Sequence, residues 1–133
     1  MAKVNCKILT PERTVVDQDV DRVVAPGSCG EFGVEPGHVA LLTPLNTGVL
    51  RTVNNDEENL YALYGGFLEV REDVVRILVD VCEHSSEIDT ERAEKAKKRA
   101  EERLDRKKDD VDTDRAKRAL IRSINRIKAA RGS

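Results

Sequence analysis

The sequence has no tryptophan, only two tyrosines and two phenylalanines, and no apolar run near the roughly 20 residues that a transmembrane helix needs. Its first residues lack a basic segment followed by an apolar one, so we expect no signal peptide. Cysteine occurs only at Cys6, Cys29 and Cys82. An odd number at wide spacing matches neither a disulfide framework nor a zinc site. It favours a reducing compartment, with all three thiols buried as small apolar side chains.

Charge and turn-forming residues are divided unevenly along the 133 residues. The formal net charge of the whole chain is -2, which gives no bias toward nucleic acid or membrane. Residues 1–84 carry 7 Lys+Arg and 14 Asp+Glu, whereas residues 85–133 carry 16 and 11. All four aromatics, all four prolines and seven of the eight glycines lie in the first part. This division predicts two domains, a β domain at residues 1–84 and a helical domain at residues 85–133.

Short alternating apolar runs separated by turn residues fill the first part. Val4, Cys6 and Ile8 alternate with polar residues, as in a strand that has one buried face. Further apolar runs surround two polar segments, residues 54–59 and 71–73, which we interpret as hairpin turns. Many short strands at this spacing are typical of an antiparallel β-sandwich or flattened barrel of roughly eight to ten strands.

Two helical segments fill the second part. Asp89 is placed to cap the first helix by accepting backbone N–H hydrogen bonds, and that helix runs to about Leu104. Residues 107–111 have no helical period and predict the turn of a hairpin. Asp112 is placed to cap the second helix, which runs to about Ala130. The predicted fold class is therefore α+β, with the sandwich followed by an antiparallel two-helix hairpin.

The apolar faces of both expected helices are thin. Their members recur at helical spacing: Ala93, Ala96, Ala100 and Leu104 on the first helix, and Ala116, Leu120, Ile124 and Ile127 on the second. Because alanine buries little area, at roughly 25 cal/mol per Å², this seam holds the hairpin together only marginally. We therefore expect the hairpin to detach easily from the sandwich and its helices to separate easily from each other.

Rows of arginine lie beside these apolar faces. They are Arg92, Arg99 and Arg103 on the first helix, and Arg115, Arg122 and Arg126 on the second. Such rows are commonly solvated faces with partners at i, i+4, and the spacing alone favours that interpretation. The alternative is an anion site, because two antiparallel helices can bring the rows together and guanidinium groups bind phosphate oxygens in bidentate geometry.

Three motifs carry a family resemblance. Residues 30–38 read Gly-Glu-Phe-Gly-Val-Glu-Pro-Gly-His, residues 65–70 read Gly-Gly-Phe-Leu-Glu-Val, and residues 88–93 read Ile-Asp-Thr-Glu-Arg-Ala. With these motifs the chain resembles, from its first strand to its last helix, the ATP-binding type of epsilon subunit of bacterial F-type ATP synthase.

The resemblance implies a ten-stranded sandwich and a two-helix hairpin in a non-catalytic subunit of the rotating central stalk. It implies docking on the gamma subunit and the c ring of a proton-translocating complex, and a peripheral location at the cytoplasmic face of the bacterial membrane. It further implies that the extended hairpin reaches the alpha and beta subunits and inhibits ATP hydrolysis. Finally, it implies that ATP, bound as a regulatory ligand, stabilises the folded, non-inhibitory hairpin.

The residues that the resemblance assigns to ATP are Glu83, Ile88, Asp89, Arg92, Ala93, Arg99, Arg122 and Arg126. Ile88 and Ala93 offer apolar contact to adenine, Glu83 or Asp89 can accept from its amino group, and the arginines suit phosphate and ribose. The sequence has no Walker-type phosphate loop and no paired carboxylates arranged for magnesium. We therefore expect no catalytic residue, no metal ligand and no requirement for magnesium.

Glu31 and His38 are the candidates for the subunit interface, because they lie in the motif at residues 30–38. The alternative for His38 is a turn histidine that only packs or hydrogen-bonds locally.

Two other functions of the whole chain are alternatives to this interpretation. It could be a structural stalk adaptor whose hairpin binds no nucleotide. A nucleic-acid module is disfavoured, because residues 85–133 have no aromatic side chain for base stacking.

Overall fold

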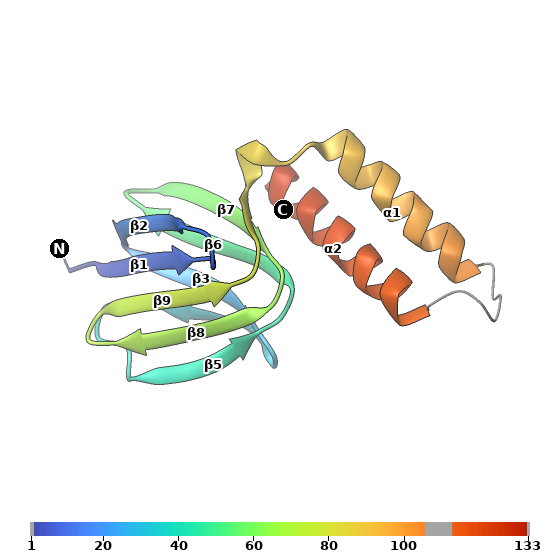
Figure 1. The fold of residues 1–133 in the computed structure, drawn as a ribbon. Helices are drawn as coiled ribbons and strands as arrows, with labels where there is room; N and C mark the ends of the chain where they lie inside the picture. The colour runs from blue at the N-terminus through green and yellow to red at the C-terminus, as the bar shows by residue number, and fades with distance from the viewer. Residues whose placement is uncertain (1, 106–112, 133) are drawn as a thin grey trace.

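A run of strands followed by helices makes up the computed structural model, which describes residues 2–105 and 113–132. The strands form two facing layers, and the helices form a hairpin beside them (Figure 1). The predicted α+β class is confirmed. The predicted turn at residues 107–111 and the predicted cap at Asp112 lie outside the described residues.

The described residues form ten short strands followed by helical elements. The strands are β1 Val4–Leu9, β2 Thr14–Val20, β3 Arg22–Gly27, β4 Gly30–Val34, β5 Leu41–Leu45, β6 Gly48–Asn54, β7 Glu57–Leu63, β8 Gly66–Arg71, β9 Val74–Val79 and β10 Cys82–His84. The helical elements are the 3-10 helix η1 Ser85–Glu87 and the α-helices α1 Thr90–Asp105 and α2 Thr113–Arg131.

Strand pairing follows the order β10-β7-β6-β3-β5-β8-β9-β1-β2, with β4 paired to β3. The pairs between described strands are antiparallel except that β1 runs parallel to β9. Antiparallel neighbours can be joined by a short hairpin, whereas β1 and β9 lie far apart in the chain. Local turn signals therefore do not determine the relative direction of this pair.

Both predicted hairpin turns are tighter than the polar segments that predict them. β6 and β7 meet at Asn55 and Asp56, with φ of 51° and 66°, and β8 and β9 meet at Glu72 and Asp73, with φ of 50° and 61°. Positive φ at both central residues gives the two-residue turn whose twist matches the strands. The polar residues beside each turn keep their side chains at the surface while their backbones continue the strand pairing.

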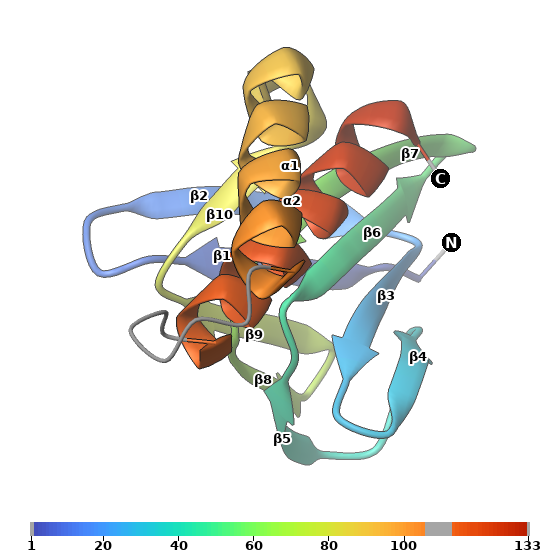
Figure 2. The ribbon, with the colours of Figure 1, turned by 90° about the vertical axis from the view of Figure 1, so that its right-hand side faces the viewer.

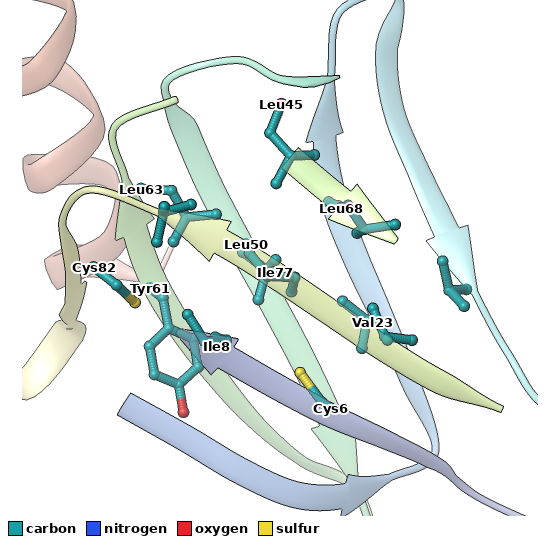
Figure 3. Packing of buried hydrophobic residues seen from close by; sticks show 14 of the residues in the cluster. Cys6, Ile8, Val23, Leu45, Leu50, Tyr61, Leu63, Leu68, Ile77 and Cys82 are labelled. Carbon is teal, nitrogen blue, oxygen red and sulfur yellow. The ribbon is translucent and has the colours of Figure 1, made fainter. Parts of the chain in front are cut away.

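The hydrophobic core lies between the two layers of strands (Figure 3). Val4, Cys6 and Ile8 of β1 are fully buried, which confirms the predicted alternation. They pack in one cluster with residues such as Leu68 and Ile77 from β8 and β9. Burial of each large apolar side chain contributes about 1.5–3 kcal/mol, so the sandwich has a source of stability that is separate from the hairpin.

Helix α2 lies between the sandwich and α1 (Figures 1 and 2). It packs against β6, β7 and η1. A small buried cluster forms this junction, with Ala62 from β7, Ile88 from the segment before α1, and Ala129 from α2. Because two of these three side chains are alanine, the junction removes little apolar surface from water.

The seam between the helices is also built from small side chains. Apart from Ala129, the buried residues of the two helices are Ala93, Ala100, Ala116, Ser123 and Ile127. The remaining predicted apolar positions are only partly buried: Ala96, Leu104, Leu120 and Ile124. The prediction of a thin seam is confirmed.

Local sequence signals predicted the start of α1 and the end of α2. The backbone N–H of Arg92 donates to Asp89 Oδ1 at 3.1 Å, which confirms the predicted cap of α1. Helix α2 ends at Gly132, whose φ is 77° and whose N–H donates to the carbonyl of Lys128 at 3.0 Å. Glycine adopts this left-handed conformation without strain, and for that reason it commonly ends helices.

The cysteines give a test of the fold. Cys6 and Cys82 are buried, and burial raises the pKa of each thiol from 9.0 to about 12. Cys29 is exposed between β3 and β4, so the prediction that all three thiols are buried was wrong for this turn residue.

At pH 8 we expect a disulfide exchange reagent to modify the exposed thiol of Cys29 rapidly and the two buried thiols only upon unfolding. Cys29→Ser should abolish the rapid phase.

The same two thiols give a pH dependence. Because their pKa is higher in the folded state than in the unfolded state, their contribution to stability is complete below about pH 9 and is lost as the pH rises toward 12. Denaturant midpoints should therefore fall between pH 8 and pH 10.5. A fall that is clearly smaller in Cys6→Ala, which keeps Cys82, than in the parent protein would support this origin, and equal falls in both would contradict it.

Candidate functional site

Glu83 on β10 is the centre of a polar cluster at the junction between the sandwich and the hairpin. Its Oε1 accepts a hydrogen bond from the Tyr64 hydroxyl at 2.6 Å. Arg126 on α2 donates from Nη2 to Oε2 at 3.0 Å, and its Nε lies 2.9 Å from Oε1. The two charged side chains are only 22% and 21% exposed, so this ion pair, with one hydrogen bond and one further close contact, is partly shielded from water.

We refer to Tyr64, Glu83 and Arg126 as the junction contact. Strand β10 pairs with β7 and places Glu83 opposite Ala62, and Tyr64 directly follows β7. Burial and the hydrogen bond to Glu83 raise the pKa of Tyr64 above its ordinary value, while the positive charges of Arg126 and Arg122 act in the opposite direction. The tyrosine therefore remains a hydrogen-bond donor at physiological pH.

Three other residues assigned to ATP have structural contacts of their own. The side chain of Ile88 is buried in the cluster with Ala62 and Ala129, and Ala93 is fully buried. Asp89 uses its carboxylate to cap α1. Their proposed contacts with adenine remain predictions, because a ligand would reach Ile88 or Ala93 only if neighbouring groups moved.

Arg92 and Arg99 lie on the exposed surface of α1. With Lys95, Lys98 and Glu102 they line a shallow hollow of about 370 Å³. Among the described residues, no hydrogen bond or ion pair joins either arginine to the junction contact. The structure thus brings Arg126 to Tyr64 and Glu83, with Arg122 near enough for its charge to act on Tyr64. The predicted convergence of both arginine rows remains a prediction.

Glu31 lies on β4, in a second charged cluster. Its Oε1 is 3.7 Å from Nη2 of Arg51 on β6, and Nη1 of Arg51 is 3.7 Å from Oε1 of Glu58 on β7. These side chains border a groove of about 540 Å³ that the end of α2 closes on one side through Asn125 and Lys128.

His38 follows Gly37, whose φ is 85°. The backbone N–H of His38 donates to the Glu35 carbonyl at 3.2 Å, and its Nδ1 lies 2.7 Å from the Val39 carbonyl oxygen. These local contacts agree with the alternative of a turn histidine. His38 remains partly exposed, so an interface role for its remaining ring nitrogen stays a prediction.

Asp73 holds the loop that carries His38, and no sequence pattern pointed to it. Its Oδ1 accepts a hydrogen bond from the Gly37 N–H at 2.8 Å, and its carbonyl accepts from the Asn5 N–H at 2.9 Å. The residue thus connects the β8–β9 turn to β1 and to the loop between β4 and β5.

The sequence analysis also missed an outer apolar face on β5, β8 and β9. Leu42, Phe67 and Leu78 are each more than half exposed and together border one hollow. Phe67 is the register partner of Leu78, so both side chains point away from the core. Consecutive apolar residues in β8 and β9, where a half-buried strand would alternate, were the available signal.

Comparison with known proteins gives the family. The beta-sandwich domain of the ATP synthase delta/epsilon chain matches residues 3–85, and the long alpha-helix domain of that chain matches residues 86–131. A protein of Desulforamulus reducens named ATP synthase epsilon chain is 46% identical over 123 residues, covering 92% of this chain and 93% of its own. One of Bacillus velezensis with the same name is 43% identical over 130 residues, covering 98% of both.

Solved structures give the same fold. A chain of the mitochondrial ATP synthase OSCP/F1/c-ring from Euglena gracilis has a TM-score of 0.81 at 23% identity, covering 91% of this chain and 77% of its own. A chain of the central stalk/c-ring of the Tetrahymena thermophila enzyme has a TM-score of 0.56 at 17% identity, covering 98% and 96%. Neither described helix is long and apolar enough to cross a membrane.

Replacement of Asp73 by alanine should loosen the loop at residues 35–40, because the Gly37 N–H loses its acceptor. Hydrogen exchange at Gly37 should accelerate by about tenfold, the effect of losing one hydrogen bond of roughly 1.5 kcal/mol. Asp73→Asn keeps an acceptor oxygen and should restore protection. Glu72→Ala, in the same turn, serves as the control for general weakening of the hairpin. Equal hydrogen exchange rates at Gly37 in Asp73→Ala and in the parent protein would show that Asp73 does not hold this loop.

Proposed function

The chain belongs to the epsilon-chain family of ATP synthase, and from this premise we propose that its sandwich docks on the gamma subunit and on the ring of c subunits. Members of this family are non-catalytic subunits of the central stalk, so the chain is not itself a hydrolase. In the assembled complex the chain is peripheral to the membrane, on the cytoplasmic face of the bacterial cell, and couples rotation to synthesis.

Two surfaces support this docking. The outer apolar face, with Leu42, Phe67 and Leu78, suits an apolar surface of the gamma subunit, because apolar patches of this kind on a soluble domain mark interaction sites. Glu31 and His38 lie on the segment from β4 to β5 and offer polar contacts to the c ring and gamma.

The hairpin supplies regulation. In the proposed cycle it leaves the sandwich, extends toward the alpha and beta subunits and inhibits ATP hydrolysis. The small apolar contact at Ala62, Ile88 and Ala129 supports this step, because little buried surface is lost when the hairpin leaves. The docked and extended states can therefore be close in free energy.

ATP is the proposed ligand of the docked hairpin, held by its phosphates on arginines rather than through magnesium. A ligand that binds only the docked state stabilises it by RT ln(1 + [L]/Kd), about 2.7 kcal/mol at a hundredfold excess over Kd. That is enough to convert a near-even population almost completely. Binding should depend on the triphosphate more than on the base.

One observation carries this proposal: Arg126 reaches from α2 to the sandwich and there holds an oxyanion, the carboxylate of Glu83. An arginine that joins the two domains through an oxyanion is the element that a phosphate-bearing ligand needs to control docking. The same contact favours a second candidate, the structural adaptor without nucleotide, because Glu83 already neutralises Arg126. Titration with ATP, followed by amide shifts in NMR spectra and with an oligonucleotide as control, distinguishes the two.

ATP affinity should fall by about ten- to a hundredfold in Arg92→Ala, the effect of losing one charge-assisted contact. Asp89→Ala should weaken binding similarly, and Asp89→Asn, which still caps α1, separates a ligand contact from helix stability. Arg118→Ala, an exposed arginine on α2, is the matched control. Calorimetric titration measures all four. Parental affinity in both Arg92→Ala and Asp89→Ala would remove these residues from the site.

Docking has its own test. Glu31→Ala or His38→Ala should weaken binding to gamma and the c ring by roughly fivefold, since loss of one peripheral polar contact costs about 1 kcal/mol. ATP affinity should not change, because both residues lie outside the junction contact. Pull-down of the stalk subunits against a Glu12→Ala control measures the effect. Full retention by both variants would count against this interface.

A further inference from the structure

The junction contact leaves little room for Glu83 to serve as a ligand contact. Its Oε1 accepts from Tyr64 and lies beside Nε of Arg126, and its Oε2 accepts from Nη2. The guanidinium edge that presents Nε and Nη2 is one of the two edges that bind oxyanions in bidentate geometry, and it is the edge that faces the sandwich residue Glu83. Glu83 therefore occupies the place that a phosphate bound to this edge of Arg126 would take.

A phosphate on this edge would also lie against the Glu83 carboxylate. Two negative charges at such short range, in a site only about one-fifth exposed, repel each other strongly. The carboxylate and the phosphate therefore exclude each other, and the carboxylate must turn away before the ligand can bind Arg126.

We propose that Glu83 is an intramolecular competitor for the anion-binding edge of Arg126, that Tyr64 positions it, and that a phosphate-bearing ligand binds by displacing it. The displacement by a ligand rests on the proposed function, in which ATP binds the docked hairpin. The inference deepens that function, because Glu83 would oppose ligand binding where an adenine acceptor would favour it. In the absence of ligand, the same contact holds α2 on the sandwich.

Tyr64 acts through Glu83 rather than on the ligand. Its 2.6 Å hydrogen bond fixes one carboxylate oxygen so that both oxygens face Arg126. Since the hydroxyl holds its proton through the physiological range, this orientation does not vary with pH there. Tyr64 is thus a positioning residue, and its removal should weaken the contact without removing the charge of Glu83.

If Glu83 competes with the ligand, its replacement has a predictable effect on ATP affinity. Glu83→Gln destabilises the docked state without ligand. It does not change the stability of the ligand-bound state, because the contact between Glu83 and Arg126 is already broken there. If the docked hairpin predominates before ATP is added, affinity increases. If the extended hairpin predominates, affinity is unchanged. A residue that contacts adenine would instead lose affinity when replaced.

The first measurement needs no ligand. Distance distributions are recorded in the full chain between labels on the native Cys29 and on Glu101→Cys, both exposed positions in different domains. Glu83→Gln should lower the ratio of docked to extended hairpin by about tenfold, the effect expected from losing a charge-assisted hydrogen bond. Tyr64→Phe should act in the same direction but less. Glu69→Gln, a carboxylate on β8, is the matched control. An unchanged distance distribution in Glu83→Gln would overturn the proposal that Glu83 holds and competes for Arg126.

The second measurement is ATP affinity of the same variants, by calorimetry. Equal or up to about tenfold tighter binding in Glu83→Gln supports displacement. Binding more than about threefold weaker overturns it and supports an adenine contact. ATP should also narrow the distance distribution of the parent. If ATP neither binds the parent nor changes its distances, the nucleotide function fails, while the first measurement still decides whether Glu83 holds the hairpin.

Discussion

The small apolar contact between α2 and the sandwich is the constraint on which the docking of the hairpin depends. Ala62, Ile88 and Ala129 are its buried members, and the seam behind it uses alanine and serine where larger side chains would bury more surface. A hairpin docked through so little apolar area has a stability that single polar contacts can change appreciably. A charged contact of ordinary strength can therefore decide whether the hairpin stays on the sandwich.

The two domains differ in the kind of interaction that stabilises them. Residues such as Val4, Leu68 and Ile77 form a continuous core that does not involve the helices, so the packing of the sandwich does not depend on where the hairpin lies. The hairpin depends on the pairing of Arg126 with Glu83, which crosses from one domain to the other. The opposite charges of residues 1–84 and 85–133 favour the docked state in addition, to an extent that salt reduces.

Properties encoded in neighbouring residues could be predicted from the sequence, and those that join distant segments could not. Alternation placed Cys6 in the core, and Asp89 was found as a cap, because both follow from local geometry. The arginines of α2 were predicted to bind an anion through the family resemblance, but Tyr64 was not singled out, since its contact with Glu83 arises only when β7 and β10 pair. The family resemblance predicted the residues of a ligand site without showing which of them contact one another.

The parallel pairing of β1 with β9 also orders events during synthesis. The first strand to leave the ribosome has one neighbour in β2, but its other edge stays unpaired until Val74–Val79 has been made. The sandwich therefore closes late, and it closes through contacts that are distant in the chain and slow to form. The hairpin follows, and its helices need only each other and a finished surface. The hairpin, which we propose leaves the sandwich, is thus also the part of the chain that arrives last, on a domain that is already complete.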